Sequence, residues 1–218
     1  MHIPDGFLDA KIWVTAAALS TGAIGYSVSK SREELDERQV PKLGIMAAFI
    51  FAAQMVNFPV GVGTSGHLLG AALAAILLGP WSACLILSTV LFIQCLAFQD
   101  GGLTALGANV FNMAVVGVLT AFIVYKVFSG ITKSKAGRNI SVFLASWGSV
   151  FAASMMATLE LSVSNQIHLS FTQIFIPMAG WHAVIGIGEG LITVVVVNFV
   201  ERLGFIDARN NTQAEVKE

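Results

Sequence analysis

Residues 178–200 read MAGWHAVIGIGEGLITVVVVNFV, and the ionisable side chains in this stretch are His182 and Glu189. A helix of about 20 mostly apolar residues is long enough to cross the hydrocarbon core of a membrane. The stretch therefore predicts a membrane-spanning helix, and six similar apolar runs predict more of them. The seven runs cover approximately residues 9–28, 43–58, 67–78, 82–98, 106–125, 140–161 and 178–200.

The composition of the chain also indicates a membrane protein. Of the 218 residues, 56% are hydrophobic and 11% are charged, whereas soluble domains carry about 25% charged residues. Mean hydropathy is +0.77. These values exclude an ordinary soluble enzyme, and the net charge of −1 leaves no basic surface for nucleic acid. We expect an all-α bundle of about seven transmembrane helices in membrane lipid, a single domain over residues 1–218.

The basic residues predict the orientation of this bundle. Eleven of the twelve Lys and Arg residues lie in three polar segments, residues 29–42, 126–139 and the tail 201–218. With seven crossings these segments face one side, and the positive-inside rule assigns that side to the cytoplasm. We therefore expect the N-terminal segment 1–8 to be extracellular. The four histidines then fall at or near the outer face: His2, His67, His168 and His182.

The N-terminus carries an unusual set of nitrogen donors. The first ten residues contain Asp5 and Asp9 but no Lys or Arg, unlike the positively charged start of a signal peptide. We therefore expect Met1 to remain, since the large His2 disfavours its removal. When they chelate one ion, the Met1 amine, the His2 backbone amide and His2 Nδ1 lie in one plane. Square-planar nitrogen coordination of this kind is typical of Ni(II) or Cu(II). His67, in a glycine-rich outer loop, is the natural fourth donor.

Each of these histidines also has a simpler interpretation: a solvated terminal residue for His2, and a loop residue held by hydrogen bonds for His67. The GxGxxG segment at residues 61–66 predicts a tight loop and not a nucleotide site. A P-loop needs Lys and then Ser or Thr at the next two positions, which here hold His67 and Leu68. No strand of a βαβ unit precedes this segment, as a dinucleotide site requires.

Four other polar residues near the apolar runs have open roles. Glu189 lies in the middle of a run, where an ionisable residue is either functional or braces two helices or a partner protein. Glu160 lies closer to the outer end, where we expect its side chain to reach toward the interface. We expect His168 and His182 to accept loop hydrogen bonds at the interface, and a supporting or entry role at the ligand site stays open for each.

Several segments together resemble the CbiM/NikM family, the substrate-capture subunits of energy-coupling-factor transporters for nickel or cobalt. The resemblance covers nearly the whole chain to about residue 200. The matching segments are residues 1–7 (MHIPDGF), 54–60 (QMVNFPV), 63–70 (GTSGHLLG), 78–81 (LGPW), 99–103 (QDGGL) and 105–109 (ALGAN).

This resemblance implies a function and a set of site residues. The Met1 amine, the His2 amide and imidazole, and His67 would hold Ni²⁺ or Co²⁺ as the transported substrate. The resemblance also implies partners: an integral membrane coupling subunit, cytoplasmic ATPase subunits and a small accessory membrane subunit, in the plasma (inner) membrane of a prokaryote. This chain itself would bind no nucleotide. Further polar residues would support the metal ligands or fix nearby loops: Asp5, Asn57, Thr64, Ser65 and Gln99.

Two other function classes stay open at this stage. An intramembrane metalloenzyme using His2 and His67 would need an open coordination position and a general base, and Glu160 is the nearest acid within a run. A stand-alone channel would show polar or charged rings along its pore, whereas charge in the middle of the runs is nearly confined to Glu189. The residues do not separate nickel from cobalt.

Overall fold

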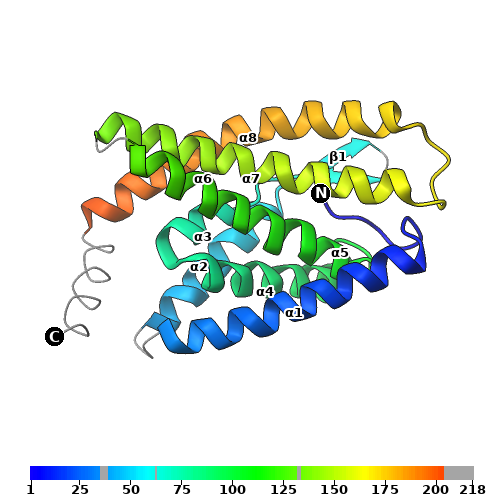
Figure 1. The fold of residues 1–218 in the computed structure, drawn as a ribbon, viewed down its shortest axis with the longest axis horizontal. Helices are drawn as coiled ribbons and strands as arrows, with labels where there is room; N and C mark the ends of the chain where they lie inside the picture. The colour runs from blue at the N-terminus through cyan, green and yellow to red at the C-terminus, as the bar shows by residue number, and fades with distance from the viewer. Residues whose placement is uncertain (35–38, 62, 132–133, 204–218) are drawn as a thin grey trace.

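The structure, a computed structural model, describes residues 1–34, 39–61, 63–131 and 134–203. Val62 and the basic residues Arg38, Lys133, Arg209 and Lys217, on which part of the orientation argument rests, lie outside the described residues. The described chain is a bundle of long helices that run side by side along the long axis of the molecule (Figure 1). Its elements are α1 (Ala10–Glu34), α2 (Val40–Gln54), β1 (Phe58–Gly61), β2 (Thr64–Gly66), α3 (Ala71–Leu78), α4 (Pro80–Phe98), α5 (Leu106–Val110), the π-helical stretch η2 (Phe111–Gly117), α6 (Val118–Ile131), α7 (Lys135–Val163) and α8 (Phe171–Arg202).

Helices form at each of the seven apolar runs. In the described part of the chain, five helical segments are long and apolar enough to cross a membrane: α1, α4, the continuous helix Leu106–Ile131, α7 and α8. The other two runs form shorter helices, because α2 has 15 residues and α3 only 8. The all-α membrane bundle is confirmed for these elements, while the count of seven crossings stays a prediction.

The segment expected as a tight loop contains a short antiparallel hairpin, which the sequence did not predict. Phe58 pairs with Gly66 and Pro59 with Ser65 in β1 and β2. Gly63 turns the chain with a φ of +69°, a left-handed conformation that glycine adopts without strain. The hairpin was missed because three- and four-residue strands rich in glycine and proline carry no alternating apolar pattern.

The run 67–78 becomes helical only at Ala71, because residues 67–70 cross from the hairpin into the bundle. Gly70 has a φ of +77°, and a Cβ atom on it would lie 2.8 Å from a side-chain carbon of Ile50. Gly79 alone then separates α3 from α4, which begins at Pro80. The first third of the short run is thus loop and the rest helix, and α3 is buried over Ala71–Ala75.

The core contains the N-terminal segment as well as the helices. Met1 and Ile3 are fully buried, each in a cluster of apolar side chains from the helices. Large apolar side chains also lie on the outside of the bundle, among them Val195 at 67% and Ile45 at 68% exposed. An apolar outer surface of this kind fits a lipid environment, since a soluble protein rarely exposes so many such residues.

Apart from Lys11, near the start of α1, the described basic residues lie in segments at one end of the bundle. Figure 1 shows that α1, α6 and α8 end at the same side of the molecule where α7 begins. Lys30 forms an ion pair with Glu33 there, at 2.8 Å, and Arg138 of α7 pairs with Glu201 of α8. From the opposite end, the N-terminal segment folds back from α1 into the bundle.

Candidate metal centre

Hydrogen bonds to the start of α5 hold the N-terminal segment inside the bundle. The Ile3 N–H donates to Oδ1 of Asn109 at 2.8 Å, and the Ile3 carbonyl accepts from the Gly102 N–H at 2.9 Å and from Nδ2 of Asn109 at 3.1 Å. The Asp5 carboxylate accepts hydrogen bonds from the Leu103 and Thr104 N–H groups at 3.0 and 2.7 Å. Both polar groups of the buried Ile3 backbone are therefore satisfied, which permits this segment to lie in an apolar core.

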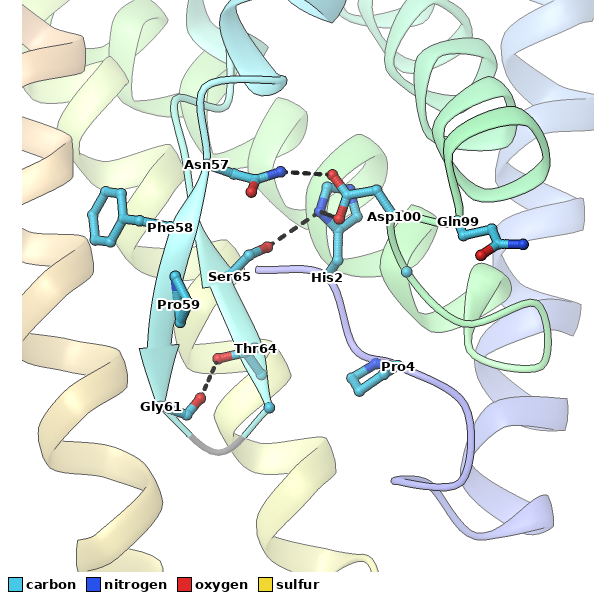
Figure 2. Close-up of a pocket in the computed structure, with 12 residues that line it drawn as sticks. His2, Pro4, Asn57, Phe58, Pro59, Gly61, Thr64, Ser65, Gln99 and Asp100 are labelled. Atoms are coloured by element: carbon cyan, nitrogen blue, oxygen red, sulfur yellow. Dashed lines mark hydrogen bonds and ion pairs between the residues drawn. The ribbon is translucent and has the colours of Figure 1, made fainter.

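The same anchoring places the first two residues against β2 and the turn after α4. The Met1 amine donates to the Ser65 carbonyl and lies 3.3 Å from Ser65 Oγ. His2 Nδ1 lies 3.4 Å from the same hydroxyl and 3.2 Å from Oδ1 of Asp100. Asn57 donates from Nδ2 to the other carboxylate oxygen of Asp100 at 2.9 Å (Figure 2). The amine and Nδ1 thus face one small polar region.

His67 lies directly against His2. The two imidazole rings are stacked with centroids 4.7 Å apart and an interplanar angle of 26°. His67 is 1% exposed, and its Nδ1 is 2.8 Å from the carbonyl oxygen of Leu68. Since a carbonyl only accepts, Nδ1 carries the proton and Nε2 keeps its lone pair. Nε2 is buried and finds no hydrogen-bond partner among the described residues, as expected of a nitrogen that binds a cation.

Burial keeps these nitrogens unprotonated at neutral pH. It lowers the pKa of the Met1 amine from 8.0 to about 4, although the charge of Asp100 acts in the opposite direction. Burial and the nearby amine lower the pKa of His2 from 6.5 to about 3, opposed by hydrogen bonding of the ring to the Gln94 side chain, which raises it. Burial also places the pKa of His67 well below 6.5. The three groups are therefore ready electron-pair donors, because only unprotonated nitrogens bind a metal.

The structure brings most of the predicted residues to this place. Met1, His2 and His67 meet, with Ser65 between the amine and the His2 ring, and Asn57 reaches them through Asp100. A cavity of about 360 Å³ lies beside His2. Its walls come from the N-terminal segment, the hairpin and the turn after α4: His2, Pro4, Asn57, Phe58, Pro59, Gly61, Gly63, Thr64, Ser65, Gln99, Asp100 and Gly101.

Three predicted residues take part only through the backbone or at a distance. Asp5 anchors the N-terminal segment at the start of α5. The Thr64 hydroxyl donates to the Gly61 carbonyl at 2.9 Å and closes the hairpin. The Gln99 side chain is exposed and points away from His2 in Figure 2. Its backbone, with a φ of +56°, ends α4 instead.

The positions of Glu160 and His182 correct two expectations. Glu160 does not reach toward the interface: it is 5% exposed and accepts a hydrogen bond from Nδ2 of Asn112 at 2.6 Å. His182 is fully buried in α8, and its Nδ1 donates to the carbonyl of Met178 at 2.7 Å. Each side chain has a hydrogen-bond partner inside the bundle, so neither needs to reach the membrane–water interface. His168 is exposed.

Glu189 is hydrogen-bonded to backbone N–H groups inside the bundle. Its carboxylate accepts from the N–H groups of Leu69 and Gly70, at 2.5 and 3.0 Å, and so ties α8 to the loop before α3. Sequence reasoning did not assign roles to Asp100, Asn109 or Gln94. Each is polar and lies within or beside an apolar run, and that position is a usable signal for a buried partner.

Side chains alone do not form a metal site here. Among the described residues, no group of three or more His, Cys, Asp and Glu side chains is close enough to hold a metal ion. The cluster around His2 contains two imidazoles, and the remaining nitrogens belong to the backbone, namely the Met1 amine and the His2 amide. A metal bound at this place therefore requires the backbone of the first two residues.

Comparison with known proteins shows the family to which the chain is related. The family model CbiM, "Cobalt uptake substrate-specific transmembrane region", matches residues 2–204. A protein of Archaeoglobus fulgidus that carries the name NikMN, for fused nickel transport, is 42% identical over 92% of this chain and 65% of its own length. A cobalt transport protein CbiM of Kyrpidia tusciae is 31% identical over 92% of this chain and 83% of its own length. The chain thus spans about two thirds of the Archaeoglobus protein.

The fold has a close counterpart among solved structures. A truncated transition metal transporter has a TM-score of 0.82 and 31% identity, and the match covers 93% of this chain and 99% of that one. A second transition metal transporter structure matches with a TM-score of 0.81. Because the family model spans almost the whole described bundle, including His2 and His67, the chain belongs to the CbiM family.

Proposed function

We propose that this chain is the substrate-specific subunit of an energy-coupling-factor transporter, capturing Ni²⁺ or Co²⁺ from outside the cell. The observation that carries the proposal is the burial of the Met1 amine and His2 against His67, with all three groups unprotonated. The names of the relatives, which refer to nickel and cobalt transport, support a divalent transition metal as the substrate.

The geometry supports capture by four nitrogens. Ser65 and Asp100 hold the Met1 amine and His2 Nδ1 on the same side of the N-terminal segment. The His2 amide lies between these two groups in the chain, so all three can chelate one ion. His67 Nε2 supplies the fourth donor. A metal would replace the weak contacts of Ser65 Oγ and Asp100, while the hydrogen bonds of Ile3 and Asp5 keep the segment in place.

Energy for release into the cell would come from partner subunits. The chain contains no P-loop lysine after its GxGxxG segment, so we propose that a membrane coupling subunit and cytoplasmic ATPases drive the loaded bundle through a conformational change, with a small accessory membrane subunit. The proposed placement is a prokaryotic plasma membrane, crossed seven times, with residues 1–8 outside and the tail 201–218 inside. No observation favours a metalloenzyme, because Glu160, its candidate base, is hydrogen-bonded to Asn112.

The decisive experiment extends the N-terminus by one residue. Adding Ala before Met1 turns the amine into an amide nitrogen and moves the free amine away from Ser65. We expect the visible spectrum of the Ni²⁺-loaded protein to change and metal uptake by the assembled transporter to be lost. The control carries the same extra residue at the C-terminus, and mass spectrometry confirms each N-terminus. Unchanged spectrum and uptake in the extended protein would refute the N-terminal site.

A further inference from the structure

One peptide group connects Glu189 to the His67 ring. The N–H of the Leu68–Leu69 peptide donates to Oε2 of Glu189 at 2.5 Å. The C=O of the same peptide accepts from Nδ1 of His67 at 2.8 Å. The two hydrogen bonds therefore run in series, from the imidazole through one planar amide to a carboxylate 122 positions further along the chain.

The neighbouring peptide groups are held equally firmly. Glu189 also accepts from the Gly70 N–H at 3.0 Å, and Nε2 of Gln54 in α2 donates to the Leu69 carbonyl at 2.7 Å. Glu189 is 3% exposed and Gln54 is fully buried. Two membrane helices far apart in the sequence thus fix the three residues that follow His67.

Close packing of α7 against α8 fits the inward position of this carboxylate. A Cβ on Gly186 would lie 2.9 Å from Trp147, and one on Gly190 would lie 2.6 Å from Phe143. These glycines let α7 approach one face of α8, whereas Glu189 lies on the face toward α3. Gly186 and Gly190, which flank this acid, therefore combine close helix packing with an inward-facing carboxyl group.

Hydrogen bonds in series polarise one another in a medium of low dielectric constant, and those that end on a carboxylate are strong. Histidines that bind metals usually donate their second ring N–H to a carboxylate or a backbone carbonyl, which fixes the tautomer and makes the ligand nitrogen more basic. In this protein the carbonyl acceptor is itself backed by a carboxylate. Nε2 of His67 is the nitrogen left without a partner among the described residues.

We propose that Glu189 is a positioning residue for His67, acting through the Leu68–Leu69 peptide to hold the ring in its Nδ1–H tautomer with Nε2 directed at the metal. The metal-binding part of this inference rests on the proposed function, whereas the tautomer part does not. Glu189 itself touches no metal. Its role is to keep one ligand oriented and electron-rich while the N-terminal chelate supplies the other three.

The test compares Glu189→Gln with Glu160→Gln, a matched loss of a second buried carboxylate that contacts Asn112 and not the His67 loop. The full chain is studied in lipid nanodiscs. Ring ¹⁵N chemical shifts, with His67→Ala for assignment, report the tautomer of metal-free His67, and calorimetry with Ni²⁺ reports affinity. We expect Nδ1–H in the wild type, a mixture of tautomers in Glu189→Gln, and a fall in affinity of about 10- to 100-fold. Glu160→Gln should retain both wild-type properties.

A double mutant separates positioning from general damage. If Glu189 acts through His67, the variant His67→Ala/Glu189→Gln binds Ni²⁺ as weakly as His67→Ala alone. An additive loss in the double mutant would overturn the proposal. So would an Nε2–H tautomer of His67 in the wild type, a result that needs no folded variant, or a wild-type tautomer and affinity in Glu189→Gln. Failure of the proposed function gives a different pattern, in which the wild type binds no Ni²⁺ while its tautomer remains Nδ1–H.

Discussion

The Met1 amine and the His2 ring are unprotonated in the folded protein because they are removed from water. Hydrogen bonds to Asn109 and Gly102 satisfy the backbone of Ile3, so the segment can be buried without leaving polar groups unpaired. The amine then contacts Ser65, on the second strand of the hairpin. The anchoring of Ile3 thus buries Met1 and His2, and this burial keeps their nitrogens unprotonated.

This burial predicts that docking of the N-terminal segment depends on pH. The pKa of the amine is 8.0 when exposed and about 4 when docked, and that of His2 is 6.5 when exposed and about 3 when docked. The released segment therefore binds protons more readily, so docking is fully favoured above pH 8 and weakens as the pH falls from 8 toward 4. Hydrogen exchange of residues 2–8 in the metal-free protein should lose protection across this range.

The control for that measurement is a peptide from the buried part of α4, whose protection should stay constant once the known pH dependence of amide exchange is subtracted. A constant level of protection in residues 2–8 down to pH 4 would contradict the assigned burial of the amine and the ring.

The assignment of His67 as the fourth donor predicts that His67→Ala and His168→Ala differ in their effect on Ni²⁺ affinity. His67→Ala removes the one imidazole stacked on His2 and should lower Ni²⁺ affinity by more than about 100-fold, since even partners that merely orient a metal ligand are worth about 10- to 100-fold. His168→Ala alters an exposed loop residue and should change affinity by about twofold at most. Titration calorimetry on both variants decides, and equal effects would refute the assignment of His67.

At the scale of elements, the site depends on how the hairpin passes into α3. β2 presents Ser65 to the N-terminus, and the loop after Gly66 presents His67 and then enters α3 at Gly70. Gly70 has a φ of +77° and lies against Ile50 of α2. This junction therefore has to be tight for both strand and helix to keep their positions.

We predict that Gly70→Ala destabilises the protein, because a side chain costs about 1–2 kcal/mol in a left-handed conformation and overpacking against Ile50 costs about 1–3 kcal/mol more. Gly188→Ala is the control, since no atom lies within 4 Å of a Cβ there and the residue is helical. Thermal unfolding in detergent should show a lower midpoint for Gly70→Ala alone. An unchanged midpoint would mean that the junction relaxes without cost.

At the scale of the whole molecule, the basic residues and the candidate metal centre lie toward different ends of the bundle. Apart from Lys11, the described basic residues of α1, α7 and α8 gather at one end, whereas the N-terminal segment enters from the other (Figure 1). Positive charge favours the cytoplasmic side of a membrane. This separation supports the proposal that the cavity beside His2 opens to the outside.

Sidedness is testable with single cysteines in a background where the buried Cys84 and Cys95 are replaced by Ala. We expect a membrane-impermeant maleimide to label His168→Cys in intact cells, because the proposed orientation places the α7–α8 loop outside. Lys126→Cys, at the basic end of α6, should react only after the membrane is opened. The reverse pattern would refute the proposed orientation.

The amino-acid sequence alone determined the membrane bundle, because long apolar runs such as 82–98 and 178–200 have no other way to satisfy their backbone than as helices in lipid. It also indicated the N-terminal donors, since the amine, amide and imidazole of Met1 and His2 are neighbours in the covalent chain. Counting Lys and Arg between the apolar runs also predicted that the basic segments lie at one end of the bundle. Each of these features depends on residues that are close together in the sequence, so the sequence alone can predict it.

Only the tertiary structure decided which distant groups meet. The stacking of His67 on His2, the contact of Asp100 with the His2 ring and the chain of hydrogen bonds from Glu189 to His67 join residues that are 65 to 122 positions apart. The periodic pattern of apolar residues does not predict such long-range contacts. The sequence around a buried acid such as Glu160 or Glu189 also does not show whether the acid binds a side chain or a backbone amide. Packing of the helices decides which partner each acid meets, because most buried polar groups are hydrogen-bonded to a group within reach.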